Sequence, residues 1–295
     1  MHAKDILAAT LVSVIWGLAF VATKIGLESF TAPQLTALRF LIACIPVLFV
    51  PRPQVSWVLL IATGLTLFAG QFLLLFLAYK AGIAAGLASV TQQMQAFFTV
   101  ILAAIFLREI PTARQSTGML VAFAGLVAIG FTTGADLPML ALGLALASAF
   151  SWAIGNILIK RIGAVEMFPL MVWLSLVSPL PALIASAYFD ADFTMIEALQ
   201  DASWPSIAAA LYLGAIATIF AYVLWGDLLT RHSAAVVAPF ALIAPCVGVI
   251  ASAIAFGERF GPLRYGGMAL VLAGLAVIVL PSKWLRRNDG TRNGP

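Results

Sequence analysis

Charged residues are scarce in this chain. Asp, Glu, Lys and Arg together make up 9% of its 295 residues, whereas soluble globular proteins carry about 25%. Apolar residues make up 63%, and the mean hydropathy is +1.07. Because so few polar side chains cannot cover the surface of a domain in water, the composition excludes a soluble globular protein and predicts one embedded in a lipid bilayer.

Long polar stretches are also missing. A membrane-spanning helix needs about 20 apolar residues, and ten such runs with short connections use nearly all of the chain. The runs are unbroken, which favours helices over barrel strands of alternating polarity. We therefore predict an all-α membrane protein whose ten transmembrane helices are Ile6–Gly26, Pro33–Val50, Trp57–Tyr79, Ala84–Leu107, Gln115–Phe131, Pro138–Ile159, Pro169–Phe189, Ser206–Leu229, Ala234–Phe256 and Leu263–Leu280.

Patterns that bind metals, cofactors or nucleic acids are absent from the sequence. Cys44 and Cys246 lie inside apolar runs, where cysteine acts as a small buried hydrophobic residue. No Cys/His spacing typical of a metal site occurs. The net charge is +4, but the basic residues form no cluster. We expect no metal, no cofactor and no nucleic-acid partner.

The distribution of basic residues predicts the orientation in the membrane. With the N-terminus inside, eleven Lys and Arg residues lie on the cytoplasmic side and five on the outer side, as the positive-inside rule requires. The acidic loop 190–205 then faces outward. The first span contains Trp16 and Lys24, so we interpret it as a helix of the mature protein and not as a signal peptide. We expect both termini to be cytoplasmic, including the polar tail 282–295.

The chain contains an internal repeat. The segment Trp16–Lys24 resembles Trp152–Lys160, with Trp and Lys eight residues apart in both. A second match joins 109–125 to 258–274 at a constant offset of 149 residues. We therefore predict one five-helix repeat at 1–134 and another at 135–281. Since five is odd, the repeats insert in opposite orientations, an arrangement common in secondary transporters that bind substrate between the halves.

Several short motifs are distributed along the chain, namely Trp16–Lys24, Arg39-Phe40, Gly86–Val90, Arg108-Glu109, Ala238-Pro239, Ala244-Pro245 and Gly257–Arg259. As a set, they resemble the EamA type of the drug/metabolite transporter superfamily. The resemblance covers the chain from Ile6 to Leu280. It implies that spans one to four and six to nine surround a central cavity, with spans five and ten outside. It also implies a bacterial inner-membrane exporter, similar to those of aromatic amino acids or cysteine-pathway metabolites.

Two triplets at matching positions of the repeat are predicted to line the cavity. In each triplet the residues are four positions apart and therefore share one helix face. The triplets are Trp16, Phe20 and Lys24 in the first span and Trp152, Asn156 and Lys160 in the sixth. The aromatic rings would stack on a substrate. The two lysines fit either a substrate-carboxylate contact or snorkelling at a helix end.

Polar residues inside other spans complete the predicted substrate site. Amides in hydrocarbon need a partner, which is either a neighbouring helix or a polar ligand. Gln92, Gln95 and Thr99 share one helix face, which we assign to the cavity, whereas Gln93 faces elsewhere. Arg39 is either a functional residue or, as we prefer, a structural clamp. The remaining candidates are Gln71, Tyr79, Tyr222, Trp225 and Pro239.

Carboxylates are absent from the middle of every predicted span. Proton-coupled carriers often use such a group as a relay, so we expect facilitated efflux, or coupling through an unusual group. Amino acids, aromatic or bulky ones in particular, are the expected small-molecule cargo. A drug, nucleotide-sugar or other metabolite carrier of the same fold is the alternative. A membrane enzyme is not expected, because no nucleophile–base pair or carboxylate cluster is present. One copy of the chain suffices for this mechanism, and the oligomeric state is left open.

Overall fold

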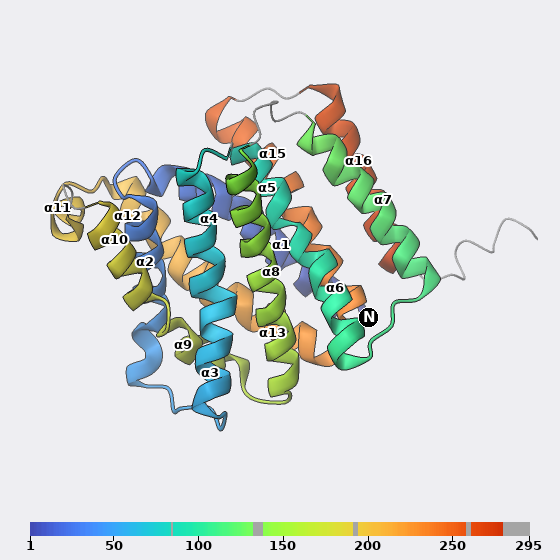
Figure 1. Ribbon diagram of the computed structural model, residues 1–295, viewed down its shortest axis with the longest axis horizontal. Helices are drawn as coiled ribbons and strands as arrows, with labels where there is room; N and C mark the ends of the chain where they lie inside the picture. The colour runs from blue at the N-terminus through green and yellow to red at the C-terminus, as the bar shows by residue number, and fades with distance from the viewer. Residues whose placement is uncertain (84, 132–137, 191–193, 258–260, 280–295) are drawn as a thin grey trace, which may run out of the picture.

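A computed structural model describes residues 1–83, 85–131, 138–190, 194–257 and 261–279 (Figure 1). Within these residues every regular element is a helix. The predicted all-α fold is therefore confirmed for the described chain. The predicted tail 282–295 and the predicted span ends Ala84 and Leu280 lie outside the described residues.

The helices follow the predicted spans closely in sequence. The first half contains α1 (Ala3–Gly26), α2 (Ala32–Cys44), η1 (Ile45–Leu48), α3 (Trp57–Gly64), η2 (Leu65–Gly70), α4 (Gln71–Lys80), α5 (Ala85–Gln92), α6 (Met94–Leu107) and α7 (Ala113–Gly130). The second half contains α8 (Met139–Ile162), α9 (Met167–Ser175), α10 (Pro179–Phe189), α11 (Met195–Gln200), α12 (Trp204–Leu211), η3 (Tyr212–Phe220), α13 (Ala221–Arg231), α14 (Ala234–Val237), η4 (Ala238–Leu242), α15 (Ile243–Phe256) and α16 (Pro262–Val279).

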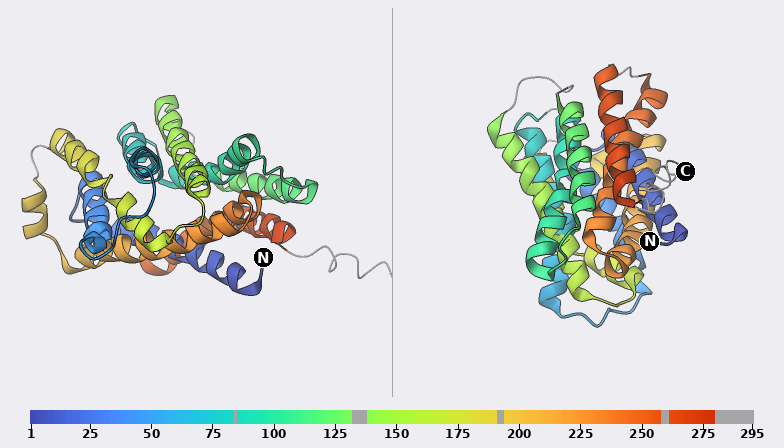
Figure 2. Two further views of the ribbon diagram at one scale, coloured as in Figure 1. Left: turned by 90° about the horizontal axis from the view of Figure 1, so that it is seen from below. Right: turned by 90° about the vertical axis from the view of Figure 1, so that its right-hand side faces the viewer.

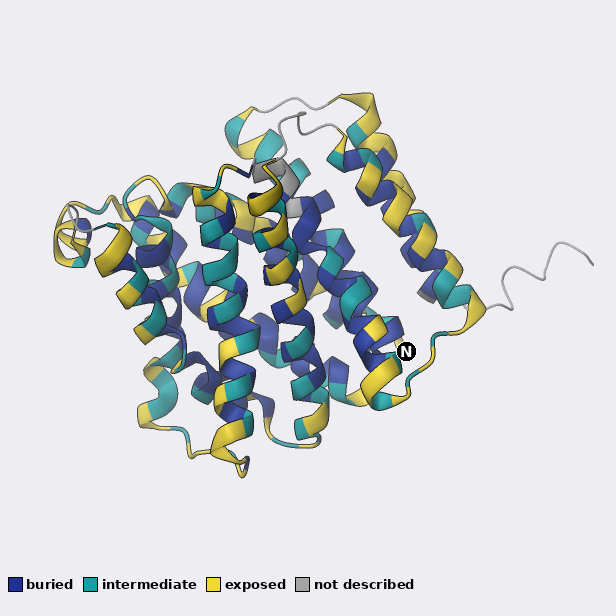
Figure 3. Cartoon of the chain, viewed as in Figure 1, coloured by how far each residue is buried: buried dark blue, intermediate teal, exposed yellow. Residues whose placement is uncertain are grey.

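Many of these helices are long and apolar enough to cross a bilayer. In the described residues, eight continuous helical segments of at least 18 residues meet this condition, and two shorter apolar helices cover Ala32–Leu48 and Pro262–Ile278. The side chains exposed on their outer surfaces are themselves apolar, among them Leu7, Val58 and Leu120 (Figure 3). An apolar exterior is what contact with lipid tails requires, so the chain is a multi-pass membrane protein.

Several spans are irregular at matching places in the two halves. The third and eighth predicted spans each contain a π-helical stretch, η2 and η3. The fourth is interrupted at Gln93, between α5 and α6, and the ninth at η4, which ends at Leu242. Arg108 and Gly257, which follow α6 and α15, are both left-handed, with φ of 57° and 68°. Both of these pairs, Gln93 with Leu242 and Arg108 with Gly257, are 149 residues apart, the offset of the sequence repeat.

Helices α7 and α16 form a separate pair at one side of the molecule. They run side by side in Figure 1 and in the right-hand view of Figure 2, and their mutual contact is the most extensive between any two elements. Four glycines make this approach possible. A Cβ atom at Gly118 would clash with the Gly274 carbonyl, and one at Gly125 would clash with the Gly267 carbonyl. Small residues of this kind let helix backbones approach closely in membranes.

The glycine contacts of α7 and α16 are reciprocal. In the repeat, Gly118 corresponds to Gly267 and Gly125 corresponds to Gly274. In the structure the pairing is crossed, because Gly118 contacts Gly274 and Gly125 contacts Gly267. Such an exchange is what a two-fold axis between two equivalent, antiparallel helices produces. The contact between α7 and α16 is thus approximately two-fold symmetric. The remaining long helices pack around a common interior, with α1 against α15 and α8 against α4 and α6.

Candidate functional site

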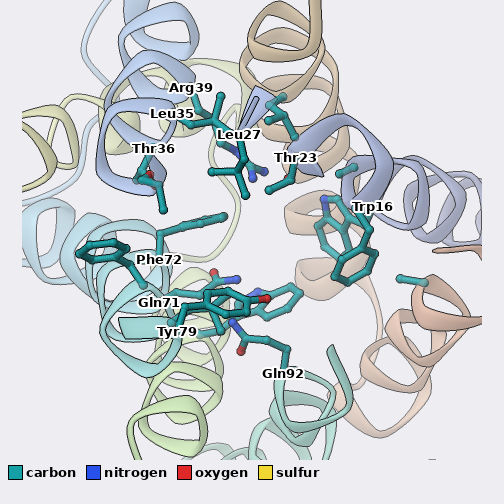
Figure 4. Close-up of a pocket in the computed structure, with 18 of the residues that line it drawn as sticks. Trp16, Thr23, Leu27, Leu35, Thr36, Arg39, Gln71, Phe72, Tyr79 and Gln92 are labelled. Carbon is teal, nitrogen blue, oxygen red and sulfur yellow. The ribbon is translucent and has the colours of Figure 1, made fainter. Parts of the chain in front are cut away.

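A cavity of about 190 Å³ lies between the helices (Figure 4). Its wall is built by α1, α2, η2 with α4, the junction of α5 and α6, α8, η3 with α13, and η4 with α15. The exposed side chains of Leu27 and Tyr79, near the ends of α1 and α4, border it. The cavity therefore reaches the surface at the end of the molecule where α1 and α4 terminate.

Trp16 is the centre of an aromatic cluster in the cavity wall. Its ring centroid lies 5.3 Å from that of Trp152, 5.0 Å from Tyr222 and 5.0 Å from Trp225. Phe68 extends the cluster by an edge-on contact with Tyr222, at 5.0 Å between centroids. Aromatic rings at these separations attract one another beyond their area of burial. The cluster gives the cavity a rigid apolar wall.

Trp16 is also fixed by a hydrogen bond to an irregular helix. Its indole Nε1 donates to the Ala217 carbonyl at 3.1 Å, within η3. In the corresponding helix of the second half, Ser151 of α8 donates to the Thr66 carbonyl of η2 at 2.8 Å. Backbone groups released by irregular turns need such partners in a membrane. Helices α1 and α8, which correspond in the repeat, thus satisfy the π-helical stretch of the opposite half.

Three buried glutamines bring amide groups to the cavity wall. Gln71, Gln92 and Gln93 are 5%, 6% and 3% exposed. Gln92 donates from Nε2 to Ser148 at 2.9 Å, and Gln71 accepts from the Tyr222 hydroxyl at 3.4 Å. Within the described residues, Oε1 of Gln92 and Oε1 of Gln93 are buried and have no hydrogen-bond donor. Unsatisfied buried acceptors are costly, and here they stand at the wall of a cavity.

A second polar cluster lies behind the cavity. Asn156 donates from Nδ2 to Gln95 Oε1 at 3.2 Å and to Thr99 Oγ1 at 3.1 Å. Its Oδ1 accepts from the Trp225 indole at 3.1 Å. All four residues are fully buried, and none of them lines the cavity. Their hydrogen bonds tie α6, α8 and α13 together next to the aromatic cluster.

Lys160 joins several helix ends at the end of the molecule opposite the opening of the cavity near Leu27 and Tyr79. Its Nζ lies 2.8 Å from Glu109 Oε1 and donates to the carbonyls of Leu229 at 2.8 Å and His232 at 2.7 Å. Glu109 Oε2 accepts from the Ala234 N–H at 2.8 Å. We call this group the Lys160 latch. It joins the ends of α6, α8 and α13 and the start of α14.

The start of α1 is tied to the same end of the molecule. The buried carboxylate of Asp5 accepts from Arg231 Nη1 at 2.9 Å and lies 3.1 Å from His232 Nε2. Arg231 also pairs with Asp227 at 2.5 Å. Because His232 takes part in both groups, the Asp5 contacts reinforce the Lys160 latch.

Seven of the predicted site residues line the cavity and seven do not. Those that line it are Trp16, Phe20, Gln71, Tyr79, Gln92, Trp152 and Tyr222. Of the others, Gln95, Thr99, Asn156 and Trp225 belong to the cluster behind the cavity, and Lys160 belongs to its latch. Lys24 lies 3.9 Å from the centre of the Phe256 ring, and Pro239 is buried in η4. In this conformation these seven residues lie outside the cavity wall, and their contact with substrate stays a prediction.

The irregularity at Gln93 explains why the fourth span lines the cavity with a different helix face from the predicted one. Gln93 N–H bonds to the Val90 carbonyl at 3.0 Å, and Ala96 N–H to the Gln93 carbonyl at 3.1 Å, so both hydrogen bonds span three residues rather than four. A three-residue turn advances by about 120° per residue instead of 100°. Faces extrapolated from Gln92 toward Thr99 are therefore displaced. Gln93, which we had placed elsewhere, lines the cavity, and Gln95 does not.

Sequence reasoning also underestimated Arg39. We preferred a structural clamp, but Arg39 lines the cavity together with Phe72, above whose ring its guanidinium carbon lies at 4.5 Å. The position of a charge seven residues into an apolar helix was the available signal. That position alone does not determine which face of α2 points into the cavity.

The multi-pass helical membrane fold and the cavity with its aromatic and amide wall are typical of membrane transporters. The sequence profile of the EamA-like transporter family matches twice, at residues 3–131 and 139–280. The chain therefore belongs to the EamA-like transporter family. The earlier resemblance is confirmed over nearly its whole length.

Relatives of this chain are named as exporters. The probable amino-acid metabolite efflux pump of Escherichia coli K12 is 38% identical, over 96% of this chain and 97% of the relative. The protein of the same name from Salmonella typhimurium is 39% identical, over 95% and 96%. The probable terminal-alkyne amino-acid exporter of Streptantibioticus cattleyicolor is 28% identical, over 98% and 97%. A solved crystal structure with 18% identity matches with a TM-score of 0.77, over 95% of this chain and 99% of the other.

Proposed function

We propose that this protein exports amino acids or closely related metabolites across the bacterial inner membrane. Transport would proceed by alternating access, would be driven by the substrate gradient and would use no cofactor. The observation that carries the proposal is a small cavity with both an aromatic and an amide wall, in a chain similar to two pumps named for amino-acid metabolites. Apolar walls with a few placed polar groups are typical of small-molecule sites. Bulky apolar side chains suit the Trp16, Trp152 and Tyr222 rings.

We further infer that ten spans form two inverted five-helix repeats, 1–134 and 135–281. Three observations support this division. The family profile matches each half separately. The breaks near Gln93 and Leu242 and the left-handed residues Arg108 and Gly257 recur at the same offset. The glycine contacts between α7 and α16 are reciprocal.

In this conformation the cavity opens at one side of the membrane and is closed at the other. The mouth lies near Leu27 and Tyr79, whereas the Lys160 latch closes the opposite end. With both termini in the cytoplasm, as the basic residues favour, the latch is cytoplasmic and the mouth faces outward. Export would then require that the latch opens to admit substrate and re-forms before release.

Proteoliposomes test the proposal directly. They are loaded with labelled L-phenylalanine, L-leucine, L-cysteine or L-threonine, and efflux is compared with that from protein-free vesicles. We expect gradient-driven efflux of at least one of them. Trp16→Ala should lower its rate by up to about tenfold, since an aromatic contact is worth about 0.5–1.5 kcal/mol beyond its buried area. Trp204→Ala is the matched control, because Trp204 is 76% exposed and lies outside the cavity.

Two results would refute parts of this proposal. If protein that size-exclusion chromatography shows to be folded exports none of the amino acids, amino acids are refuted as the substrate. Uphill accumulation driven by a pH gradient alone would refute facilitated efflux and require a proton relay. The described lining residues contain no carboxylate that could serve as one.

A further inference from the structure

Arg39 is the one charged side chain among the described residues that line the cavity. It is 8% exposed. Its Nε donates to Thr218 Oγ1 at 2.5 Å, and its guanidinium stacks above Phe72. Within the described chain neither terminal nitrogen has a protein acceptor, and no carboxylate pairs with the cation. Of the five N–H donors of an arginine, four are left for a partner that is not part of the protein.

A structural clamp would look different. A buried cation is strongly disfavoured unless a counter-charge or several acceptors surround it. Lys160 at the latch illustrates such a residue, since its ammonium has one carboxylate and two carbonyl partners. Arg39 has only the Thr218 hydroxyl, which fixes one edge of the guanidinium. Thr218 and Phe72 therefore hold the guanidinium in place. Its two terminal nitrogens, Nη1 and Nη2, can still donate hydrogen bonds to a ligand.

The wall opposite Arg39 has the complementary chemistry. Figure 4 shows Arg39 and Gln92 approaching the cavity from opposite sides, with Phe72 and Trp16 between them at the flanks. Among the described lining residues, Oε1 of Gln92 and Oε1 of Gln93 are buried and have no hydrogen-bond donor. Rotation of either amide would present its oxygen to a cationic group in the cavity. One fixed cation facing uncharged acceptors suits a ligand that carries one negative and one positive group.

We propose that Arg39 binds the α-carboxylate of a free amino acid, with the ammonium group toward the Gln92 and Gln93 amides and the side chain against the Trp16 cluster. The inference rests on the proposed function and narrows it to substrates that carry a free carboxylate. Arginine matches a carboxylate with two parallel hydrogen bonds. A phosphate dianion would call for further cations, and the described lining residues supply none.

Binding of matched ligand pairs tests this assignment. The purified full chain in nanodiscs is titrated with L-phenylalanine and L-phenylalaninamide, and with L-leucine and L-leucinamide, following tryptophan fluorescence. The members of each pair differ only in the carboxylate. We expect the parent to bind the acid about 100-fold more tightly than the amide, as two charge-assisted hydrogen bonds imply.

Variants separate recognition from a structural role. Arg39→Met should bring the acid-to-amide ratio close to one, while affinity for the amide stays within about threefold. Arg39→Lys keeps the charge and loses the fork, so it should retain a ratio of only about tenfold. Thr218→Val removes the Nε anchor that fixes the guanidinium, so its acid-to-amide ratio should fall below that of the parent. Lys80→Met is the control for total charge, because Lys80 lies at the end of α4 outside the cavity.

The outcomes distinguish this inference from the broader proposal. If the parent binds acid and amide equally, or if Arg39→Met weakens both to the same extent, carboxylate recognition by Arg39 is refuted and the exporter proposal stands. If no amino acid is bound or exported by the parent, the proposed function fails and the inference fails with it. Should Arg39→Met not fold, the parent's ratio and the Arg39→Lys ratio still decide the question.

Discussion

Loss of the Lys160 latch should open the end of the protein that we propose to be cytoplasmic. In Lys160→Met, Glu109 and the carbonyls of Leu229 and His232 lose the ammonium that joins them. Breaking a buried ion pair costs about 3–5 kcal/mol. Since the Glu109 side chain is 26% exposed, water recovers part of this, and we expect a loss of about 2–3 kcal/mol.

Under the proposed alternating access, this energy shifts the ratio between the two access states. The latch can exist only while the ends of α6, α8 and α13 are together, so its loss destabilises the closed end alone. At 1.4 kcal/mol per factor of ten, the ratio of closed to open molecules falls by about 30- to 140-fold. A population that starts near 99:1 would then lie between about 3:1 and 1:1.

Cysteine labelling measures this ratio. Ala103 is fully buried among Ala153, Ile157 and Ala234, just inside the latch, so a cysteine there reacts with an impermeant maleimide only when that end is open. The native cysteines at 44 and 246 are first replaced by serine and alanine. In inside-out vesicles, Lys160→Met should accelerate labelling of Ala103→Cys at least about tenfold. The exposed Ala113→Cys is the control and should not change.

A charge exchange sharpens the test. Lys160→Glu combined with Glu109→Lys preserves an ion pair, but it places a carboxylate against two carbonyls and an ammonium against the Ala234 N–H. The exchange should therefore fail to restore slow labelling. Unchanged labelling in Lys160→Met, or full recovery in the exchanged protein, would refute the latch as described.

Three further perturbations test the packing around the site, each read from thermal unfolding in detergent. Asn156→Leu leaves the Trp225 N–H unpaired and removes the amide donor from Gln95 and Thr99, so it should cost about 2–3 kcal/mol; no loss would contradict the network. Ser151→Ala frees a carbonyl of η2 and should cost about 1–2 kcal/mol; no loss would mean that another group satisfies it. Gly17→Val should lower the unfolding temperature most, since a Cβ there would meet Val247 at 2.5 Å, and a neutral effect would contradict the close approach of α1 and α15.

The sequence predicted the spans well because their signal is a length of apolar chain. A bilayer imposes that length on every segment, so boundaries such as those of α1 and α8 follow from composition alone. The repeat was equally accessible, since matches such as Gly118 with Gly267 recur at one offset. Both are properties that a linear pattern retains.

The inward faces were less accessible, because they depend on how regular each helix is. Periodicity assumes a uniform turn, and the three-residue hydrogen bonds at Gln93 break that assumption. Lys160 illustrates a second limit. Its spacing from Trp152 placed it on the cavity stripe, but its partners come from α6, α13 and α14, which no local pattern reveals. Arg39 needed the fold before a clamp could be distinguished from a ligand contact.

The glycine seam between α7 and α16 has a consequence for the energetics of transport. If the two halves exchange conformations during the cycle, each contact at Gly118–Gly274 becomes its counterpart at Gly125–Gly267. Because the exchange converts each of these two glycine contacts into the other, the α7–α16 interface has the same energy before and after it. It can act as a neutral pivot, which holds the halves together without biasing the direction in which the cavity opens. Which side of the membrane the cavity opens to is then determined by elements that differ between the halves. The Lys160 latch is the first of these.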